Sequence, residues 1–219
     1  MKTLSKAVAI ASLVSASALT AQVANAEVEY SADLATTYLW RGTDLGGTLF
    51  GAAADYSHDS GLYAGAWVGG GDLVQGNELD LYVGFAKDFG SVSVDAGVYT
   101  YVYNRGVDTD TGADVNGSAG EMSELVVSAG FADASVAYTT SLQDQDYTYI
   151  TLGYSVAGAD LTYGMSDDDG SKYAHFDISY GLTDELAITV SQPIEDTEGA
   201  LDDTDTIVVC LTAFQSNNY

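Results

Sequence analysis

The chain is poor in basic residues, and this shortage excludes one large class of function. Six Lys and Arg residues stand against 32 Asp and Glu residues, which gives a formal net charge of -26. Two of the basic residues, Lys2 and Lys6, lie at the very N-terminus, so the remainder of the chain is still more acidic. A field of this sign repels phosphate groups, and we therefore expect no nucleic-acid partner.

Cysteine, proline and long apolar runs are also scarce. Cys210 is the only cysteine, which excludes an intrachain disulfide. The only proline, Pro193, is expected in a long loop, because proline cannot donate a hydrogen bond to a β-ladder. No run of 18 apolar residues follows Ala26, so the sequence predicts no membrane-spanning helix. The 16 Tyr and the hydrophobic share of 47% argue against disorder and favour a folded all-β chain.

The first 26 residues have the pattern of a secretory signal peptide. A basic start with Lys2 and Lys6 precedes a short apolar stretch from Ala7 to Ala21, and Ala24-Asn25-Ala26 is a small-x-small cleavage site. The apolar stretch is too short and too rich in serine for a spanning helix. We therefore expect cleavage after Ala26 and a single mature domain over residues 27–219.

Most of the mature chain alternates between apolar and polar residues, which is the period of a β-strand. In the first segment Val28, Tyr30 and Ala32 alternate with Glu29 and Ser31. Twelve such segments follow one another, and the last one, residues 206–214, is apolar on both faces. The sequence therefore predicts about twelve strands, each with one apolar and one polar face.

The predicted connections alternate between short and long. Residues 58–61 and 157–158 are short, whereas residues 41–48, 104–122 and 167–171 are long. An even number of strands, with tight turns at one rim and longer loops at the other, is typical of a closed antiparallel transmembrane β-barrel. A soluble β-sandwich would also alternate, but its loops need not divide so regularly. We thus expect a barrel in the outer membrane of a Gram-negative bacterium, with both termini at the periplasmic rim.

Several stretches resemble a known family: residues 35–42, 61–67, 78–84, 95–99 and the Tyr101–Tyr103 pair. They resemble the TorF-type porins, also known as the Gcw_chp family. This resemblance implies a small outer-membrane barrel that admits solutes of unassigned identity. It also implies contact with lipid, lipopolysaccharide and the barrel assembly machinery, the last of which reads a C-terminal aromatic, either Phe214 or Tyr219. A homo-oligomer stays open.

The inward-facing acids are the first candidate site. By strand parity they are Glu29, Asp33, Asp55, Asp80, Asp95, Glu124, Asp160 and Asp177. Charged groups in a narrow barrel shape the field along the pore, which predicts passive passage of small cationic or neutral solutes. The simpler interpretation is that these groups only fill a wet interior. Arg41 and Arg105 lie where a strand meets a long loop, and we place both at the pore mouth.

Three other functions stay open at this stage. Bulky inward aromatics, among them Tyr63, Trp67, Tyr82, Tyr99 and Tyr101, are able to fill the lumen of a structural or adhesive barrel. His175 and Asp177 share a strand face and are the candidate pair for a barrel hydrolase, although we expect no enzyme and no catalytic residue. Acid-rich loops over residues 108–114 and 167–169 have the oxygen ligands that calcium prefers, but their spacing is poor, so we expect neither metal nor cofactor.

Outward aromatics are expected in girdles at the two membrane interfaces. This interpretation covers Tyr30, Tyr38, Trp40, Tyr56, Phe85, Phe89 and Tyr180.

Overall fold

The computed structural model describes residues 27–73, 76–104, 117–144, 146–197 and 206–217. These ranges are built from β-strands, and they contain no helix long and apolar enough to cross a membrane. Several sequence expectations fall outside the described residues: the signal peptide over residues 1–26, Arg105, the acidic loop 108–114 and Tyr219.

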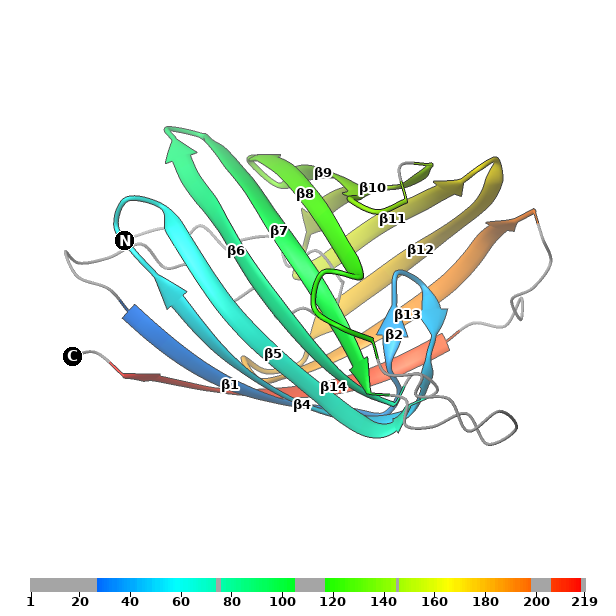
Figure 1. Ribbon diagram of the computed structural model, residues 1–219, viewed down its shortest axis with the longest axis horizontal. Coiled ribbons are helices and arrows are strands. Elements are labelled where there is room, and N and C mark those ends of the chain that lie inside the picture. Colours follow the sequence, from blue (N-terminus) through cyan, green and yellow to red (C-terminus); the bar gives the residue numbers. More distant parts are fainter. Residues whose placement is uncertain (1–26, 74–75, 105–116, 145, 198–205, 218–219) are drawn as a thin grey trace.

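Twelve antiparallel strands form one closed barrel (Figure 1). Each strand pairs with its neighbours along the chain, as the alternating segments predict. The strands are β1 (Glu27–Ala35), β4 (Gly46–Ser57), β5 (Leu62–Leu73), β6 (Asn77–Phe89), β7 (Val92–Asn104), β8 (Met122–Phe131), β9 (Ala134–Ser141), β10 (Tyr147–Val156), β11 (Ala159–Asp168), β12 (Ser171–Gly181), β13 (Leu186–Asp196) and β14 (Thr206–Asn217).

The barrel closes because β1 pairs on both of its edges. Glu27 lies opposite Ser57 of β4, and Val28 lies opposite Asn217 of β14. Closure leaves neither edge of the sheet unpaired, which removes the exposed edges that a sandwich or an open sheet would present. The all-β class and the count of twelve barrel strands are therefore confirmed.

Strand alternation separates an inner polar face from an outer apolar face. In β1, Ser31 and Asp33 are buried inside, whereas the Tyr30 side chain is 46% exposed on the outer surface. The same division holds in the other strands, so that the outer surface carries large apolar side chains, for example Phe50, Leu62, Val68, Val83, Phe85, Val127, Leu152, Ile178, Tyr180 and Ile207. A soluble protein would bury side chains of this kind.

The turns agree only in part with the predicted division into two rims. The expected long loop over residues 167–171 is a two-residue turn between β11 and β12. Asp169 and Gly170 adopt φ angles of 49° and 90°, which is the geometry of a tight hairpin turn that favours an Asp-Gly sequence. The acids of residues 167–168 thus belong to β11 rather than to a flexible loop, and Asp167 lies 3.8 Å from the ammonium group of Lys172.

The prediction for Pro193 is wrong, because this residue lies within β13 and not in a loop. It faces His175 of β12 at a β-bulge, where the register shifts between Ala174 and His175. The register between β13 and β14 extends only from Leu186 to Ser191, so Pro193 lies beyond that described ladder. Proline is tolerated at a bulge and where its nitrogen faces no ladder partner, and Pro193 has both settings here.

A short hairpin, β2 (Leu39–Trp40) with β3 (Thr43–Asp44), interrupts the connection between β1 and β4. It forms a separate two-stranded sheet, and its contacts with β8, β10 and β12 place it inside the barrel (Figure 1). Residues 41–48 were expected to form a long loop, but residues 41–44 belong to the inward hairpin and residues 46–48 to β4. Tyr38 and Trp40 were expected in the outward girdle, and this is wrong: the Tyr38 side chain is only 2% exposed, inside the barrel. The other five girdle aromatics are exposed or partly exposed on the outer surface.

Candidate functional site: an inward hairpin on an acidic wall

The tip of the β2–β3 hairpin is a two-residue turn formed by Arg41 and Gly42. Their φ angles are 49° and 80°, so both residues adopt the left-handed conformation that two-residue hairpin turns require. Glycine tolerates this conformation because it lacks a Cβ atom, whereas arginine pays about 1–2 kcal/mol for it. The turn directs the Arg41 side chain across the interior toward the opposite wall.

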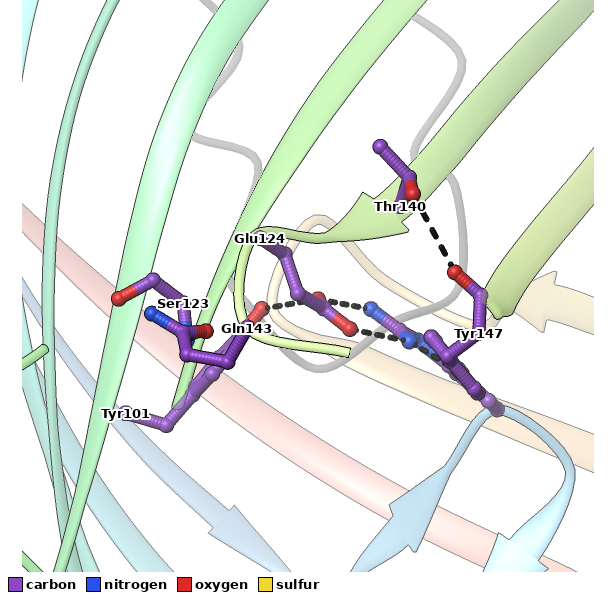
Figure 2. A network of polar contacts seen from close by, with 7 residues as sticks. Tyr101, Ser123, Glu124, Thr140, Gln143 and Tyr147 are labelled. Atoms are coloured by element: carbon purple, nitrogen blue, oxygen red, sulfur yellow. Dashed lines mark hydrogen bonds and ion pairs between the residues drawn. The ribbon is translucent and has the colours of Figure 1, made fainter. Parts of the chain in front are cut away.

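Arg41 forms a bidentate ion pair with Glu124 of β8. Its two terminal nitrogens donate to the two carboxylate oxygens, at 2.9 Å to Oε1 and 2.5 Å to Oε2. One of these nitrogens also donates to the Tyr147 hydroxyl at 2.6 Å. The Tyr101 hydroxyl donates to Glu124 Oε2 at 2.9 Å, so that Glu124 lies between Tyr101 and Tyr147 (Figure 2). Parallel hydrogen bonds of this kind are among the strongest that side chains form.

Aromatic rings surround the guanidinium group. Its central carbon lies 4.7 Å from the ring centroid of Trp40, 4.7 Å from that of Tyr149 and 5.8 Å from that of Tyr147. Rings at these distances attract a cation through their negative faces. Burial alone would lower the pKa of Arg41, but the hydrogen bond and charge of Glu124 outweigh it and hold this pKa above its ordinary value. Arg41 therefore remains charged inside the barrel.

Further contacts fix the hairpin to the wall on both sides. The Tyr38 hydroxyl donates to Glu78 of β6 at 2.8 Å, and the Tyr38 ring lies 6.3 Å from that of Trp67. Trp40 packs edge-on against Tyr101 of β7, with ring centroids 5.7 Å apart. From the other side, the Tyr173 hydroxyl of β12 donates to the Gly42 carbonyl oxygen at 2.8 Å. The hairpin thus bridges opposite parts of the barrel wall.

His175 and Asp177 are brought together as the sequence suggests, in a network that packs against the hairpin tip. His175 Nδ1 lies 2.8 Å from Asp177 Oδ1, and His175 Nε2 hydrogen-bonds the Tyr149 hydroxyl at 2.8 Å. The Ser191 hydroxyl donates to Asp177 at 2.6 Å, so this serine is a partner of the carboxylate and not of the imidazole. His175 and Asp177 are both 0% exposed. This arrangement suits a structural network better than a hydrolase, whose nucleophile must contact the base.

All eight acids predicted from strand parity lie on the inner side of their strands. Asp33, Asp80, Glu124 and Asp177 are buried. Asp55, Asp95 and Asp160 are partly buried and accept hydrogen bonds from the hydroxyls of Tyr82, Tyr63 and Ser155 respectively. Glu29 is partly buried on the same face of β1 as Ser31 and Asp33. Arg41 was expected at the pore mouth, but its side chain lies inside the barrel and is 9% exposed.

Glu78, Tyr147 and Tyr149 were not among the predicted site residues. Glu78 shares the inner face of β6 with Asp80, so parity alone is enough to find it. Tyr147 and Tyr149 have the same inward parity in β10, but their role depends on Arg41, which lies 106 residues from Tyr147 in the chain. Contacts at this separation have no local sequence signal.

The inner aromatics pack beside the hairpin rather than leaving an open bore at that level. Trp67 is 1% exposed, and Tyr82 and Tyr101 are buried. Gly51 and Gly69 make room for the indole ring, because a Cβ atom at either position would come within 3 Å of it. Together with Tyr38 and Arg41, these side chains narrow the interior near the hairpin. Among the described residues, no group of three or more His, Cys, Asp or Glu side chains is arranged to hold a metal ion.

The structure defines a closed β-barrel with an acidic interior and an inward hairpin. The model of a family described as "Bacterial protein of unknown function (Gcw_chp)" matches residues 20–207. The chain belongs to this family, which confirms that part of the resemblance. A comparison with curated proteins gave no match.

Solved structures similar to the chain include three outer-membrane barrels. The KdgM porin in complex with disordered oligogalacturonate is 10% identical, with 88% of this chain and 99% of that chain covered and a TM-score of 0.46. Outer membrane phospholipase A from Escherichia coli is 14% identical, with 90% and 97% covered and a TM-score of 0.48. The COG4313 outer membrane channel from Pseudomonas putida F1 is 13% identical, with 90% and 97% covered and a TM-score of 0.44.

Proposed function

We propose that this protein is a narrow outer-membrane channel of the TorF type for small cationic or neutral solutes. The observation that carries the proposal is the contrast between an acid-lined interior and an apolar outer surface. In this proposal the signal peptide over residues 1–26 exports the chain, and residues 27–219 enter the membrane with the help of the barrel assembly machinery. The outer surface then faces lipid and lipopolysaccharide.

Placement in a membrane predicts a specific response to charge on the outer surface. Val83 lies at the middle of β6 and is 56% exposed there. Replacing it with arginine is expected to lower the free energy of unfolding in lipid vesicles by about 2–4 kcal/mol, because charge at the bilayer midplane is costly. Urea titration of the folded barrel in vesicles measures this loss.

Asp59→Arg is the matched control, since Asp59 is exposed in the short turn between β4 and β5. At a rim the same side chain reaches water, and we expect a change of less than about 0.5 kcal/mol. Equal effects of the two substitutions would contradict membrane placement of β6.

The charge of the interior predicts cation preference. Among the described interior acids, Glu124 pairs with Arg41 and Asp177 contacts His175, whereas Asp33, Asp55, Asp95 and Asp160 form no ion pair with a described basic side chain. Unbalanced carboxylates in a narrow passage favour cations over anions. In planar bilayers with a KCl gradient, the reversal potential is therefore expected to lie on the K⁺ side, and the Asp95→Asn variant is expected to move it toward zero. A reversal potential on the Cl⁻ side would contradict the proposal.

The packing around the hairpin favours a second function, a structural or adhesive barrel without transport. Tyr38, Trp67 and Arg41 are all buried inside, so the interior is narrowed where they meet. Single-channel recording separates the two functions. A conductance carried by the purified protein supports the channel, whereas an electrically silent barrel supports the structural function.

A further inference from the structure

We propose that the part of the barrel wall that holds Arg41 is a binding site for small guanidinium-type cations, for which the Arg41 side chain is an internal stand-in. The site consists of Glu124, Tyr101, Tyr147 and Tyr149, and we call it the guanidinium site. The inference rests on the proposed channel for its physiological meaning. It assigns to that channel a preferred class of solute, namely organic cations with a planar, hydrogen-bonding head group.

The guanidinium site belongs to the barrel wall and not to the hairpin. Tyr101 lies in β7, Glu124 in β8, and Tyr147 and Tyr149 in β10, and all three strands pair only with strands of the barrel. The hairpin sheet contains just two residue pairs, Leu39 with Asp44 and Trp40 with Thr43. Moving the hairpin away would therefore break no hydrogen bond of the barrel ladder, and the site would stay assembled.

The chemistry of the site matches a guanidinium group more closely than a simple metal ion. Glu124 offers both carboxylate oxygens to two nitrogens, and the Tyr147 hydroxyl accepts a further hydrogen bond. The Tyr149 ring adds a face at 4.7 Å. A planar fork of donors uses all of these groups together, whereas a spherical cation uses only the charge.

The backbone conformation at Arg41 is an observation separate from its side-chain contacts, and it also bears on why an arginine occupies this turn. A turn with both central residues at positive φ favours Asn-Gly, and arginine at the first position is strained. Asparagine would relieve this strain but would lose the bidentate pair with Glu124, so the strained arginine is kept for that contact. The proposal accounts for this arginine: its guanidinium group occupies a site that also binds the guanidinium group of a solute.

The surroundings supply attraction for an arriving cation. Glu78 and Asp80 lie on the neighbouring inner face of β6, and both are at least nine-tenths buried. The two side chains interact with each other, and Glu78 also accepts a hydrogen bond from the Tyr38 hydroxyl at 2.8 Å. Two carboxyl groups buried this close together do not both ionise, so the pair contributes about one negative charge next to the guanidinium site.

Arg41→Asn is the variant that tests the inference. It removes the guanidinium group and leaves an Asn-Gly turn, so the hairpin is expected to form as before. The probe is methylguanidinium chloride. Its binding is followed by tryptophan fluorescence, because Trp40 packs against Tyr101 of the site, while Trp67, the second tryptophan, packs against Tyr38. Because Arg41 no longer competes, the variant is expected to bind the probe at least about tenfold more tightly than the native protein.

Three further measurements make the outcome specific. Glu124→Gln in the Arg41→Asn background should abolish the gain, and methylammonium chloride should bind more weakly than methylguanidinium. Arg41→Lys, which keeps the charge but loses the fork, should give an intermediate affinity and serves as the second variant if Arg41→Asn does not fold. Equal probe affinity in the native protein and both Arg41 variants, or binding that Glu124→Gln leaves unchanged, overturns the inference.

Fluorescence does not depend on conduction, so the two proposals fail separately. If the barrel is electrically silent but still binds the probe through Glu124, the guanidinium site is supported and the channel is contradicted. A cation-selective conductance without such binding keeps the channel and overturns the guanidinium site.

Discussion

Replacing Gly164 with alanine is expected to destabilise the barrel by about 3–5 kcal/mol, because the new methyl group has no free space. A Cβ atom at Gly164 would lie 2.1 Å from His175 Nε2 and 2.4 Å from the Tyr149 hydroxyl. The imidazole has little room to move aside. Its other nitrogen contacts Asp177, and Gly42 packs so closely against the ring that a Cβ atom there would lie 2.2 Å from it. The substitution therefore separates His175 from Tyr149, or displaces the hairpin tip.

Urea unfolding in lipid vesicles, followed by tryptophan fluorescence, measures the loss. Gly181→Ala is the matched control, because a Cβ atom there finds its nearest neighbour at an ordinary 3.6 Å. We expect that control to change the free energy of unfolding by no more than about 1 kcal/mol, in the stabilising direction. In a His175→Ala background Gly164→Ala should cost less, because only the Tyr149 hydroxyl remains close and its hydrogen bond to His175 no longer holds it there. A large cost that persists in that background would show that the contact with His175 is not the cause.

The barrel itself could be predicted from the sequence because its determinants are local. A period of two over each strand defines which residues face inward, and this is enough to place Asp33, Asp80 and Asp177 inside. The even strand number and the turn lengths predict closure. Parity also indicates Glu78, which has the same signal as Asp80 and belongs among the interior acids.

The inward hairpin could not be predicted in the same way. Tyr38 and Trp40 alternate with Leu39 and Arg41, and this short pattern fits an outward strand end as well as a turn inside the barrel. What draws the segment inward is a set of partners far away in the chain, above all Glu124, which lies 83 residues from Arg41. The position of Pro193 was missed for a related reason, since a β-bulge depends on the register with β12 and has no signal in β13 alone.

The hairpin also changes what the negative charge implies. The net charge and the strand parity together predict an acidic interior that is open to water. In the structure one arginine enters that interior and neutralises Glu124, while aromatic side chains fill the space around the ion pair. In the proposed channel, passage of a solute would therefore depend on how firmly Glu124 holds Arg41, and the coupling energy between these two side chains measures that strength.

Replacing Glu124 with alanine is expected to cost about 3–5 kcal/mol in the free energy of unfolding, because it leaves the Arg41 guanidinium group buried without its counter-charge. Arg41 is only 9% exposed, so water cannot easily replace the carboxylate. The Tyr101 hydroxyl would lose its acceptor as well, which adds to the cost. Urea titration in vesicles, with Trp40 and Trp67 as reporters, measures the change.

The Arg41→Asn variant provides the control, since it removes the buried charge while keeping a turn that favours its new residue. In the double variant Arg41→Asn/Glu124→Ala the cost of losing Glu124 should fall to about 1–2 kcal/mol, which gives a coupling energy of about 2–3 kcal/mol between the two side chains. If the two substitutions were additive, Arg41 would be free to leave the interior when Glu124 is lost. The hairpin would then be held in place by Tyr38 and Trp40, and not by the ion pair.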